Sequence, residues 1–289
     1  MSARAWVIFI AVALLWGAPY LLIKVAVDDG VPPGFVAWAR VVIAAAILFA
    51  LAARAGVLGS LRGRLRWLAA FALIEITLPF PLIAAAERHV SSSLTAILIA
   101  TAPLFVAVLA PVLDPEEKAG PRRLAGLLVG FGGVVALAGL DVAGRRDEWL
   151  GAAAILAASV CYAIGPIVFK NHLADLDRRA SMGGCLALGV LFLAPVAAFD
   201  LPRALPSPTA LGAIVGLGVF CTAAAFVLWG ALIAEVGPGR ALVVTYLNPV
   251  VAVALGMAFL HERLGLGTVV GLVLILAGSW LAADGAAAH

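Results

Sequence analysis

Long apolar runs alternate with short polar connections along almost the whole chain. A run of about 20 apolar residues is long enough to cross the hydrocarbon core of a bilayer as a helix. The pattern predicts an all-α integral membrane protein with ten transmembrane helices, called spans one to ten below. They are expected at residues 5–27, 35–53, 67–87, 90–113, 121–140, 149–171, 181–199, 209–234, 238–260 and 264–283. The connections between them are too short to fold as separate domains.

Composition agrees with this class of protein. Hydrophobic residues make up 64% of the chain and charged residues 12%, whereas soluble domains average about 45–50% apolar and about 25% charged residues. The same values exclude a disordered chain. The net charge of +3 does not indicate nucleic-acid binding, because the basic residues are scattered among the connections. Cys161, Cys185 and Cys221 lie inside apolar runs and predict no disulfide framework.

The distribution of Lys and Arg predicts the orientation of the chain. With the N-terminus in the cytoplasm, most basic residues outside the spans fall on the cytoplasmic side, as the positive-inside rule requires. An even number of spans then returns the C-terminus to the cytoplasm. The first run has no small-residue cleavage site, so it is expected to remain as a membrane span. We therefore expect a multi-pass protein of a bacterial-type plasma (inner) membrane.

Two parts of the chain resemble each other. Residues 101–116 align with 247–262, and residues 16–24 resemble 162–170. Pro103 aligns with Pro249 in the first pair, and the second pair is similar around Pro19 and Pro166, which favours a true internal repeat. Chance similarity between helices rich in Ala, Val and Leu is the alternative.

The repeat predicts how the spans are organised. Residues 1–145 would form a first five-helix repeat and residues 146–289 a second one. Because five is odd, the second copy must be inverted relative to the first. Many transporters use inverted repeats to build one site with two symmetry-related gates. The predicted fold is therefore two inverted five-helix repeats around a central cavity.

Short motifs in the spans resemble those of a known family. They are Trp16-Gly17-x-Pro19 and Lys24 in span one, Arg40 early in span two, and Glu262-Arg263 before a glycine-rich span ten. Together with the two five-span halves, they resemble the EamA-type drug/metabolite transporters over essentially the whole chain. Residues 114–117 depart from the pattern, because Asp-Pro-Glu-Glu stands where a Glu-Arg pair is expected. Within the family the chain resembles the YddG-type exporters, which implies export of aromatic and other neutral amino acids.

Five prolines interrupt the predicted helices. A proline inside a helix leaves the carbonyl four residues earlier without its hydrogen bond, and in lipid such a group must be buried in protein or line a watery cavity. A kink alone is the common explanation for one membrane proline, but breaks in five spans together predict a central, polar-lined cavity. The breaks, which are also the expected gating positions, are Pro19, Pro79, Pro103, Pro166 and Pro249.

Aromatic and small polar residues lie beside these breaks. The aromatic residues would suit a flat apolar side chain, and packing between helices is the alternative for each; they are Trp16, Tyr20, Phe80, Tyr162 and Tyr246. The polar residues could bind a polar head group; they are Thr77, Thr95, Thr101, Thr245 and Asn248. Together they predict an amino acid with a bulky apolar side chain as substrate.

Charged residues inside the spans are few. Glu75 is the only acidic residue deep within a span, and its charge is costly to bury unless it is protonated, paired or facing water. It could carry a coupling proton or hold a substrate ammonium, and the alternative is a protonated side chain that hydrogen-bonds a neighbouring helix. Lys24 and Arg40 are expected to snorkel to the outer surface or to pair with Glu87. No desolvated basic cluster is evident, so a phosphate-bearing substrate is not expected.

Known catalytic and metal-binding motifs do not occur in the sequence, so we expect no enzyme, no cofactor and no metal ion. The predicted function is export of small neutral or zwitterionic metabolites, chiefly aromatic or hydrophobic amino acids, by alternating access. A multidrug or metabolite exporter of the same fold is the first alternative, and an intramembrane enzyme, a passive channel or a scaffold are others. The expected partners are the small-molecule substrate and the lipid bilayer. Gly126xxxGly130 and Gly267xxxGly271 predict close helix packing, either inside a monomer or between the chains of a homodimer.

Overall fold

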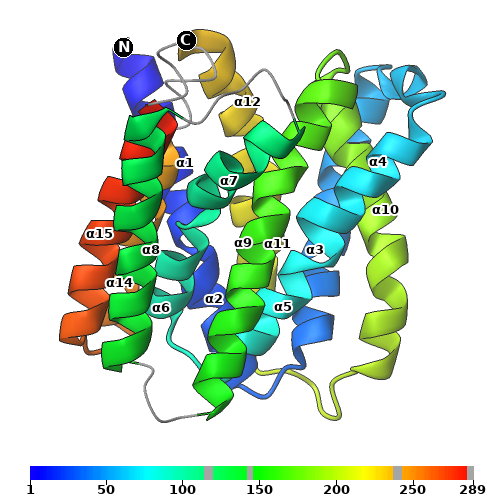
Figure 1. Cartoon of the computed structure of the whole chain (residues 1–289). Coiled ribbons are helices and arrows are strands. Elements are labelled where there is room, and N and C mark those ends of the chain that lie inside the picture. The colour runs from blue at the N-terminus through cyan, green and yellow to red at the C-terminus, as the bar shows by residue number, and fades with distance from the viewer. Residues whose placement is uncertain (114–119, 142–145, 237–242, 285–289) are drawn as a thin grey trace.

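Helices account for all the regular structure in the described part of the chain. The computed structural model describes residues 1–113, 120–141, 146–236 and 243–284, and it contains no strand in these ranges (Figure 1). The prediction of an all-α protein is therefore confirmed. The first helix begins and the last one ends at the same end of the bundle (Figure 1). This end is called the N-terminal end below, and the opposite one is called the far end.

Seven helical segments in the described ranges are long and apolar enough to cross a membrane. They coincide with predicted spans one to four and six to eight: Ala3–Asp28, Pro33–Arg54, Leu65–Ala86, Ser92–Leu109, Arg146–His172, Arg178–Phe199 and Pro208–Val236. Three shorter apolar helices coincide with predicted spans five, nine and ten: Leu124–Leu137, Val244–Phe259 and Leu266–Leu281. The segments follow the predicted order, and ten membrane-crossing helices stay a prediction.

Five of the predicted spans consist of two or three shorter elements. Span one is α1 (Ala3–Gly17) and α2 (Pro19–Asp28); span three is α4 (Leu65–Ala72), η2 (Leu73–Thr77) and α5 (Pro79–Ala86); span four is α6 (Ser92–Ile99) and α7 (Ala102–Leu113); span eight is α11 (Pro208–Gly218), η3 (Val219–Ala224) and α12 (Ala225–Val236); span nine contains η4 (Val243–Tyr246) and α14 (Asn248–Phe259). Four prolines stand at the first or second residue of a helix, where the missing N–H has no helical partner to lose. They are Pro19, Pro79, Pro103 and Pro249.

The other spans are single helices. They are α3 (Pro33–Arg54), α8 (Pro121–Asp141), α9 (Arg146–His172), α10 (Arg178–Phe199) and α15 (Leu266–Asp284), and the short η1 (Leu58–Leu61) lies between α3 and α4. The helix α9 continues through Pro166. The prediction that this proline interrupts span six was therefore wrong. The proline removes one hydrogen bond from a helix of 27 residues, and α9 also packs along α5 and α7.

Two of the interruptions are π-helical turns. In η2 the Thr77 hydroxyl donates a hydrogen bond to the Ala72 carbonyl oxygen at 3.0 Å. In η3 the Thr222 hydroxyl donates to the Leu217 carbonyl oxygen at 2.8 Å. In η2 the backbone N–H of Leu78 also donates to the Leu73 carbonyl oxygen, five residues earlier, which is the spacing of a π-helix. No proline lies in or beside η3, and the interruption of span eight was therefore not predicted.

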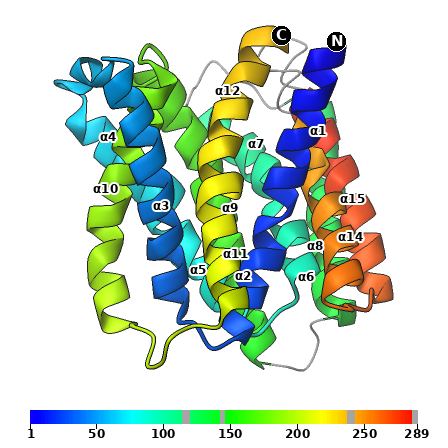
Figure 2. The ribbon, with the colours of Figure 1, turned by 180° about the vertical axis from the view of Figure 1, so that it is seen from behind.

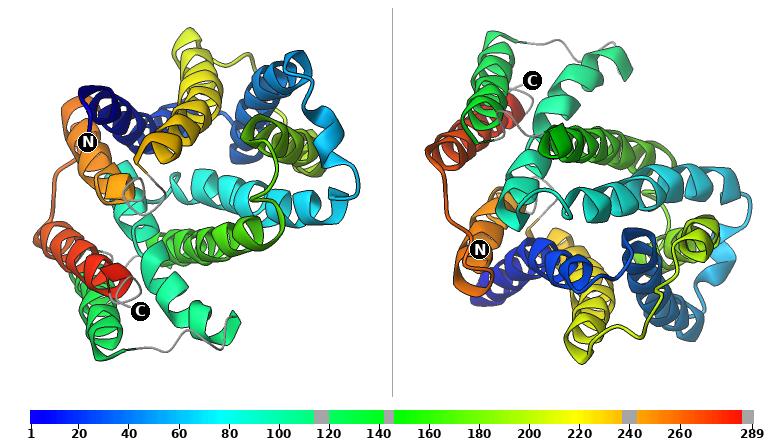
Figure 3. Two further views of the ribbon diagram at one scale, coloured as in Figure 1. Left: turned by 90° about the horizontal axis from the view of Figure 1, so that it is seen from above. Right: turned by 90° about the horizontal axis from the view of Figure 1, so that it is seen from below.

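Helices from the two halves of the chain pack on each other in matching pairs. The pair α8 and α15 lies at one side of the bundle, and the pair α3 and α10 lies at the other (Figures 1 and 3). Between them α5 packs on α9, and α2 packs on α11. The helix α7 also packs on α9, as α1 does on α14 and on α12 (Figure 2).

Glycines bring α8 and α15 into close contact. A Cβ atom added at Gly278 would overlap the backbone of Gly130 and lie 2.6 Å from the carbonyl oxygen of Gly126. A Cβ at Gly271 would lie 2.8 Å from the Cβ of Leu137. The close packing predicted for these glycines thus occurs between two helices of one chain.

Candidate functional site

Glu75 lies in the π-helical turn η2 and is directed against α9. Its side chain is half-buried, and a Cβ atom added at Gly165 of α9 would overlap its carboxylate. The absence of a side chain at Gly165 therefore makes room for the carboxyl group. The Oε2 atom of Glu75 is buried and has no hydrogen-bond partner among the described residues. A buried carboxyl oxygen without a partner is costly, and it is free to accept a hydrogen bond from a ligand.

Arg40 lies on α3 and is directed into the protein. Only 7% of its surface is exposed. Its Nη2 atom donates a hydrogen bond to the Thr222 hydroxyl at 3.1 Å, and its guanidinium carbon lies 4.0 Å from the centre of the Phe80 ring. Its Nε atom is buried and has no partner among the described residues.

The inward position of Arg40 corrects the expectation that it snorkels to the surface. Its charge interacts electrostatically with Glu87, but the described residues show no ion pair in contact distance between the two. The hydroxyl of Thr222 accepts its hydrogen bond, and the face of Phe80 attracts its positive charge. These two groups replace part of the hydration that the guanidinium loses on burial.

Tyr162 of α9 joins Glu75 and Arg40 into one cluster. Its phenol interacts electrostatically with Glu75, Arg40 and Tyr20. Tyr20 of α2 also interacts electrostatically with Arg40. We call these five residues, Tyr20, Arg40, Glu75, Tyr162 and Thr222, the central polar cluster. It combines two opposite charges with two phenols, contributed by spans one, two, three, six and eight.

Three threonines that were predicted to bind a polar group instead donate their hydroxyl hydrogen bonds to main-chain carbonyl oxygens. Thr77 donates to the Ala72 carbonyl oxygen, as described above. The buried Thr101 donates to the Leu98 carbonyl oxygen at 2.6 Å, at the junction of α6 and α7. Both hydroxyls thus stabilise the interrupted helices that carry them. Thr95 likewise donates to the Ser91 carbonyl oxygen at 3.0 Å.

Trp16 lies in an aromatic group between α1 and α12. Its ring centre is 5.0 Å from that of Trp229 and 6.2 Å from that of Phe226. Phe226 also packs against the buried residues around Phe80. The structure thus gives Trp16 clear packing contacts, and its predicted contact with substrate stays a prediction.

The predicted site residues of span nine lie near α15. The Tyr246 hydroxyl donates to the Ser279 carbonyl oxygen at 3.2 Å. Thr245 belongs to the same short element, η4. Asn248, at the start of α14, has a buried side-chain oxygen with no partner among the described residues.

Charged residues at the far end hold the helix ends together. Lys24 donates to the main-chain oxygen of Glu87 at 2.7 Å and pairs with Asp28 at 3.0 Å. The Glu87 carboxylate is fully buried, and neither of its oxygens has a hydrogen-bond partner in the described ranges. Lys24 therefore hydrogen-bonds the backbone of Glu87, and the Glu87 carboxylate interacts electrostatically with Lys24 and Arg40.

Glu262, from the predicted family motif, caps a helix of the other half of the chain. Its carboxylate accepts hydrogen bonds from the backbone N–H groups of Ser92, at 2.7 Å, and Ser93, at 3.1 Å, and from the Ser93 hydroxyl. These groups lie at the start of α6, where a negative charge is favourable. His261, in a left-handed conformation with φ of 53°, turns the chain after α14. The corresponding residues of the first half, 114–117, lie outside the described residues.

We expect Glu262→Ala to destabilise the fold by about 2 kcal/mol, because it removes a charged cap from α6. The midpoint of thermal unfolding in detergent, followed by tryptophan fluorescence, measures this change. The matched control is Arg263→Ala, which alters the neighbouring exposed side chain and should leave the midpoint unchanged. Equal midpoints for both variants would contradict the capping role.

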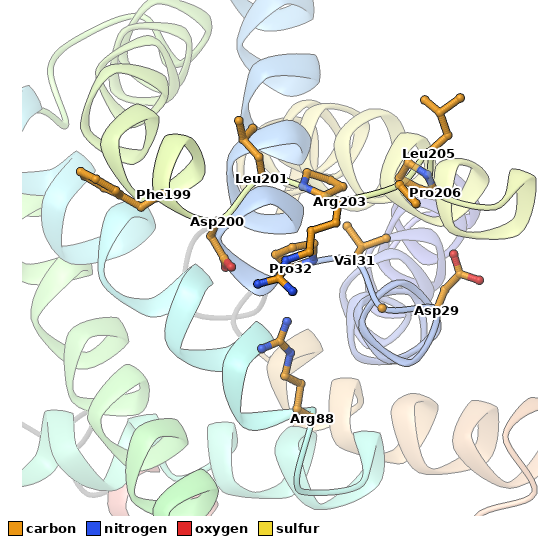
Figure 4. Close-up of a pocket in the computed structure, with 13 residues that line it drawn as sticks. Asp29, Val31, Pro32, Arg88, Phe199, Asp200, Leu201, Arg203, Leu205 and Pro206 are labelled. Atoms are coloured by element: carbon orange, nitrogen blue, oxygen red, sulfur yellow. The ribbon is translucent and has the colours of Figure 1, made fainter.

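Two pockets lie at opposite ends of the bundle. The larger, of about 440 Å³, is at the far end and is lined by the connections around residues 29–32 and 199–206 (Figure 4). The smaller, of about 360 Å³, is at the N-terminal end among α3, α10 and α12. Neither is lined by a residue that the sequence predicted to bind substrate. The predicted central cavity stays a prediction.

The chain matches a known family in each half. The sequence profile of the EamA-like transporter family matches residues 4–139 and again residues 149–283. The two matches together cover nearly the whole chain.

Known proteins are similar to the chain over almost their full length. The "Uncharacterized inner membrane transporter YedA" of Escherichia coli strain K12 is 30% identical, over 94% of this chain and 90% of that protein. The "Probable terminal-alkyne amino-acid exporter" of Streptantibioticus cattleyicolor is 29% identical, over 97% of this chain and 93% of that protein. "Protein PagO" of Salmonella typhimurium is 27% identical, over 86% of this chain and 83% of that protein.

A solved crystal structure also shares the fold. It aligns with a TM-score of 0.68 and 21% identity, and the alignment covers 99% of both chains. The family profile and the relatives named as transporters point to a membrane transporter and not to an enzyme. The chain is therefore a multi-pass membrane protein that belongs to the EamA-like transporter family.

Proposed function

We propose that the protein exports small zwitterionic metabolites, chiefly aromatic or other hydrophobic amino acids, by alternating access. The observation that carries this proposal is the pair of unsatisfied charged groups in the central polar cluster. Arg40 has a buried Nε atom without a partner, and Glu75 has a buried Oε2 atom without a partner. Both side chains interact electrostatically with Tyr162.

A zwitterion is complementary to such a pair. Its carboxylate can accept a hydrogen bond from the Arg40 guanidinium, and its ammonium can donate one to the Glu75 carboxylate. A buried polar atom without a hydrogen-bond partner is costly, so a ligand that supplies a partner to the Arg40 Nε atom and to the Glu75 Oε2 atom removes two penalties at once. A purely cationic or purely anionic ligand would satisfy only one of the two groups.

The surroundings of the cluster suit an apolar side chain. Phe80 lies under the Arg40 guanidinium, and Tyr20 and Tyr162 interact with this guanidinium electrostatically. Aromatic rings offer large apolar faces with defined stacking geometry. The similarity to a protein named as an amino-acid exporter supports the same substrate class. We also assign Trp16, Thr245, Tyr246 and Asn248 to the substrate path, as the sequence predicted.

Alternating access rests on the two halves of the chain acting as inverted repeats, residues 1–145 and 146–289. The family profile matches each half separately. The packing also has two-fold character, because span three packs on span six as span eight packs on span one, and span four packs on span six as span nine packs on span one. Spans three and eight, which occupy equivalent places in the halves, both contain a π-helical turn closed by a threonine. We place both termini in the cytoplasm, with the far end outside.

The proposed function is tested by transport in proteoliposomes. Saturable counterflow of labelled phenylalanine, competed by tryptophan and leucine and not by cationic dyes, is the expected result. Flux of a cationic dye without amino-acid counterflow would favour the multidrug alternative. Non-saturable flux would indicate a channel, and conversion of the substrate would indicate an enzyme.

If the interruptions at Pro103 and Pro249 act as paired gates, replacing either proline should slow transport. Pro103→Ala and Pro249→Ala supply an N–H group at the start of α7 and α14, respectively, and should stiffen the junctions there. We expect each variant to lower the initial rate of counterflow about tenfold, equivalent to about 1.4 kcal/mol, with little change in unfolding temperature. The matched control is Pro195→Ala in the unbroken helix α10. Parental rates in both variants would contradict the paired gates.

A further inference from the structure

The far-end pocket of about 440 Å³ is built from three separate parts of the chain (Figure 4). One wall is the connection between α2 and α3, around residues 29–32. A second is the connection between α10 and α11, around residues 199–206. Arg88, which follows α5, closes the third side. Three prolines, Pro32, Pro202 and Pro206, restrict the backbone of these walls.

Two guanidinium groups face each other across this pocket. The side chains of Arg88 and Arg203 point toward one another in the close-up (Figure 4). Neither makes an ion pair or a hydrogen bond that the described part of the chain supplies. Like charges that converge repel one another. An anion placed between them would convert this repulsion into two attractive contacts.

The acidic residues of the pocket are held by backbone groups. An oxygen of Asp200 accepts a hydrogen bond from the Gly34 N–H at 3.0 Å. An oxygen of Asp29 accepts one from the Ser207 N–H, also at 3.0 Å. Both carboxylates thus fix the pocket walls, and neither forms an ion pair with the two arginines within the described residues. The arginines are therefore the groups available to a ligand.

Three exposed apolar side chains stand at the edge of this polar pocket and point away from its two arginines (Figure 4). Phe199 is 95% exposed, Leu205 is 96% exposed, and Leu201 is also exposed. All three line the pocket and lie at or just beyond the end of α10, a membrane-spanning segment. An apolar patch of this kind is unfavourable in water and favourable against acyl chains. The pocket thus places two cationic groups next to a surface that suits lipid.

We propose that this pocket binds a phospholipid at the far end of the bundle. The phosphate lies between the guanidinium groups of Arg88 and Arg203, whose planar forks match phosphate oxygens. The glycerol and the upper acyl chains lie against Phe199, Leu201 and Leu205. A free phosphate would engage the arginines alone and leave these three apolar side chains uncovered. The lipid site is separate from the central polar cluster and does not depend on the transported substrate.

The experiment titrates three probes into the delipidated full-length protein in detergent and counts bound molecules by native mass spectrometry. The probes are dioleoylphosphatidylglycerol, dioleoylglycerol, which lacks the phosphate, and inorganic phosphate, which lacks the chains. We expect one tightly retained phosphatidylglycerol, with at least roughly tenfold weaker binding of the other two probes. A tenfold loss corresponds to about 1.4 kcal/mol.

Variants separate the two halves of the proposed site. R88Q/R203Q should weaken phosphatidylglycerol binding at least roughly tenfold, and F199S/L205S should weaken it while both arginines remain. Arg146→Gln, which alters an exposed arginine at the start of α9, is the matched control and should bind like the parent. Parental lipid binding by R88Q/R203Q would overturn the proposal. Equal affinity for inorganic phosphate and for the lipid would overturn it in favour of a soluble-anion site.

Discussion

Replacing Arg40 with methionine should reduce transport of zwitterionic amino acids by roughly two to three orders of magnitude. The substrate carboxylate would then lie in a buried site without a cationic partner, and removing one member of a buried charge pair costs about 3–5 kcal/mol. Methionine keeps apolar bulk beside Phe80 and loses only the guanidinium that lies over its ring, so the loss should come from the missing charge. The measurement is the KM and maximal rate of phenylalanine counterflow in proteoliposomes.

Substrate analogues distinguish recognition by Arg40 from a structural role. The parent protein should prefer phenylalanine to phenethylamine, which lacks the carboxylate. In Arg40→Met this preference should disappear, whereas Arg40→Lys should retain part of it because the charge remains and the planar fork is lost. Thr222→Val removes the hydrogen bond to Arg40 and keeps the guanidinium, so it is the matched control. An unchanged KM for phenylalanine in Arg40→Met would contradict the assignment.

Hydropathy was sufficient to locate the helical segments but not the contacts between them. Apolar run length predicts a membrane helix because the bilayer thickness is fixed, and the described helices follow the predicted spans in order. Prolines at Pro19 and Pro79 predicted interruptions because they remove a helical hydrogen bond. The interruption in span eight is the π-helical turn η3, which contains no proline and for which the apolar pattern gives no signal.

The wrong prediction for the Arg40 side chain also arose because contacts between helices were not visible in the sequence. Its place near the end of span two favoured snorkelling to the surface, because a long side chain near a helix end can reach water. Its actual partners, Thr222 and Phe80, lie on other helices and far away in the sequence. Periodicity within one helix cannot indicate which residues of other helices face it. Glu75 was easier to single out, because an acid deep in an apolar run is unusual whatever its neighbours are.

Glu75→Gln should weaken the transport of phenylalanine about a hundredfold, equivalent to about 2.7 kcal/mol, and should spare substrates that lack an ammonium group. Glutamine keeps the size and the hydrogen-bonding capacity of the side chain beside Gly165 and removes its negative charge. The counterflow KM of phenylalanine and of 3-phenylpropionate, which lacks the amine, measures the difference. The parent should prefer phenylalanine, and the variant should lose this preference. Asp175→Asn, in an exposed ion pair with Arg64, is the control and should match the parent.

A second measurement separates ammonium binding by Glu75 from proton coupling. A residue that only carries a coupling proton is needed for efflux driven by a pH gradient and much less for exchange of labelled against unlabelled substrate at equal pH. We expect Glu75→Gln to impair both modes for phenylalanine, because the ammonium contact is lost whenever the amino acid binds. Normal exchange with loss of gradient-driven efflux would instead assign Glu75 to proton transfer. Normal phenylalanine affinity together with normal efflux at every pH would remove its charge from the transport cycle.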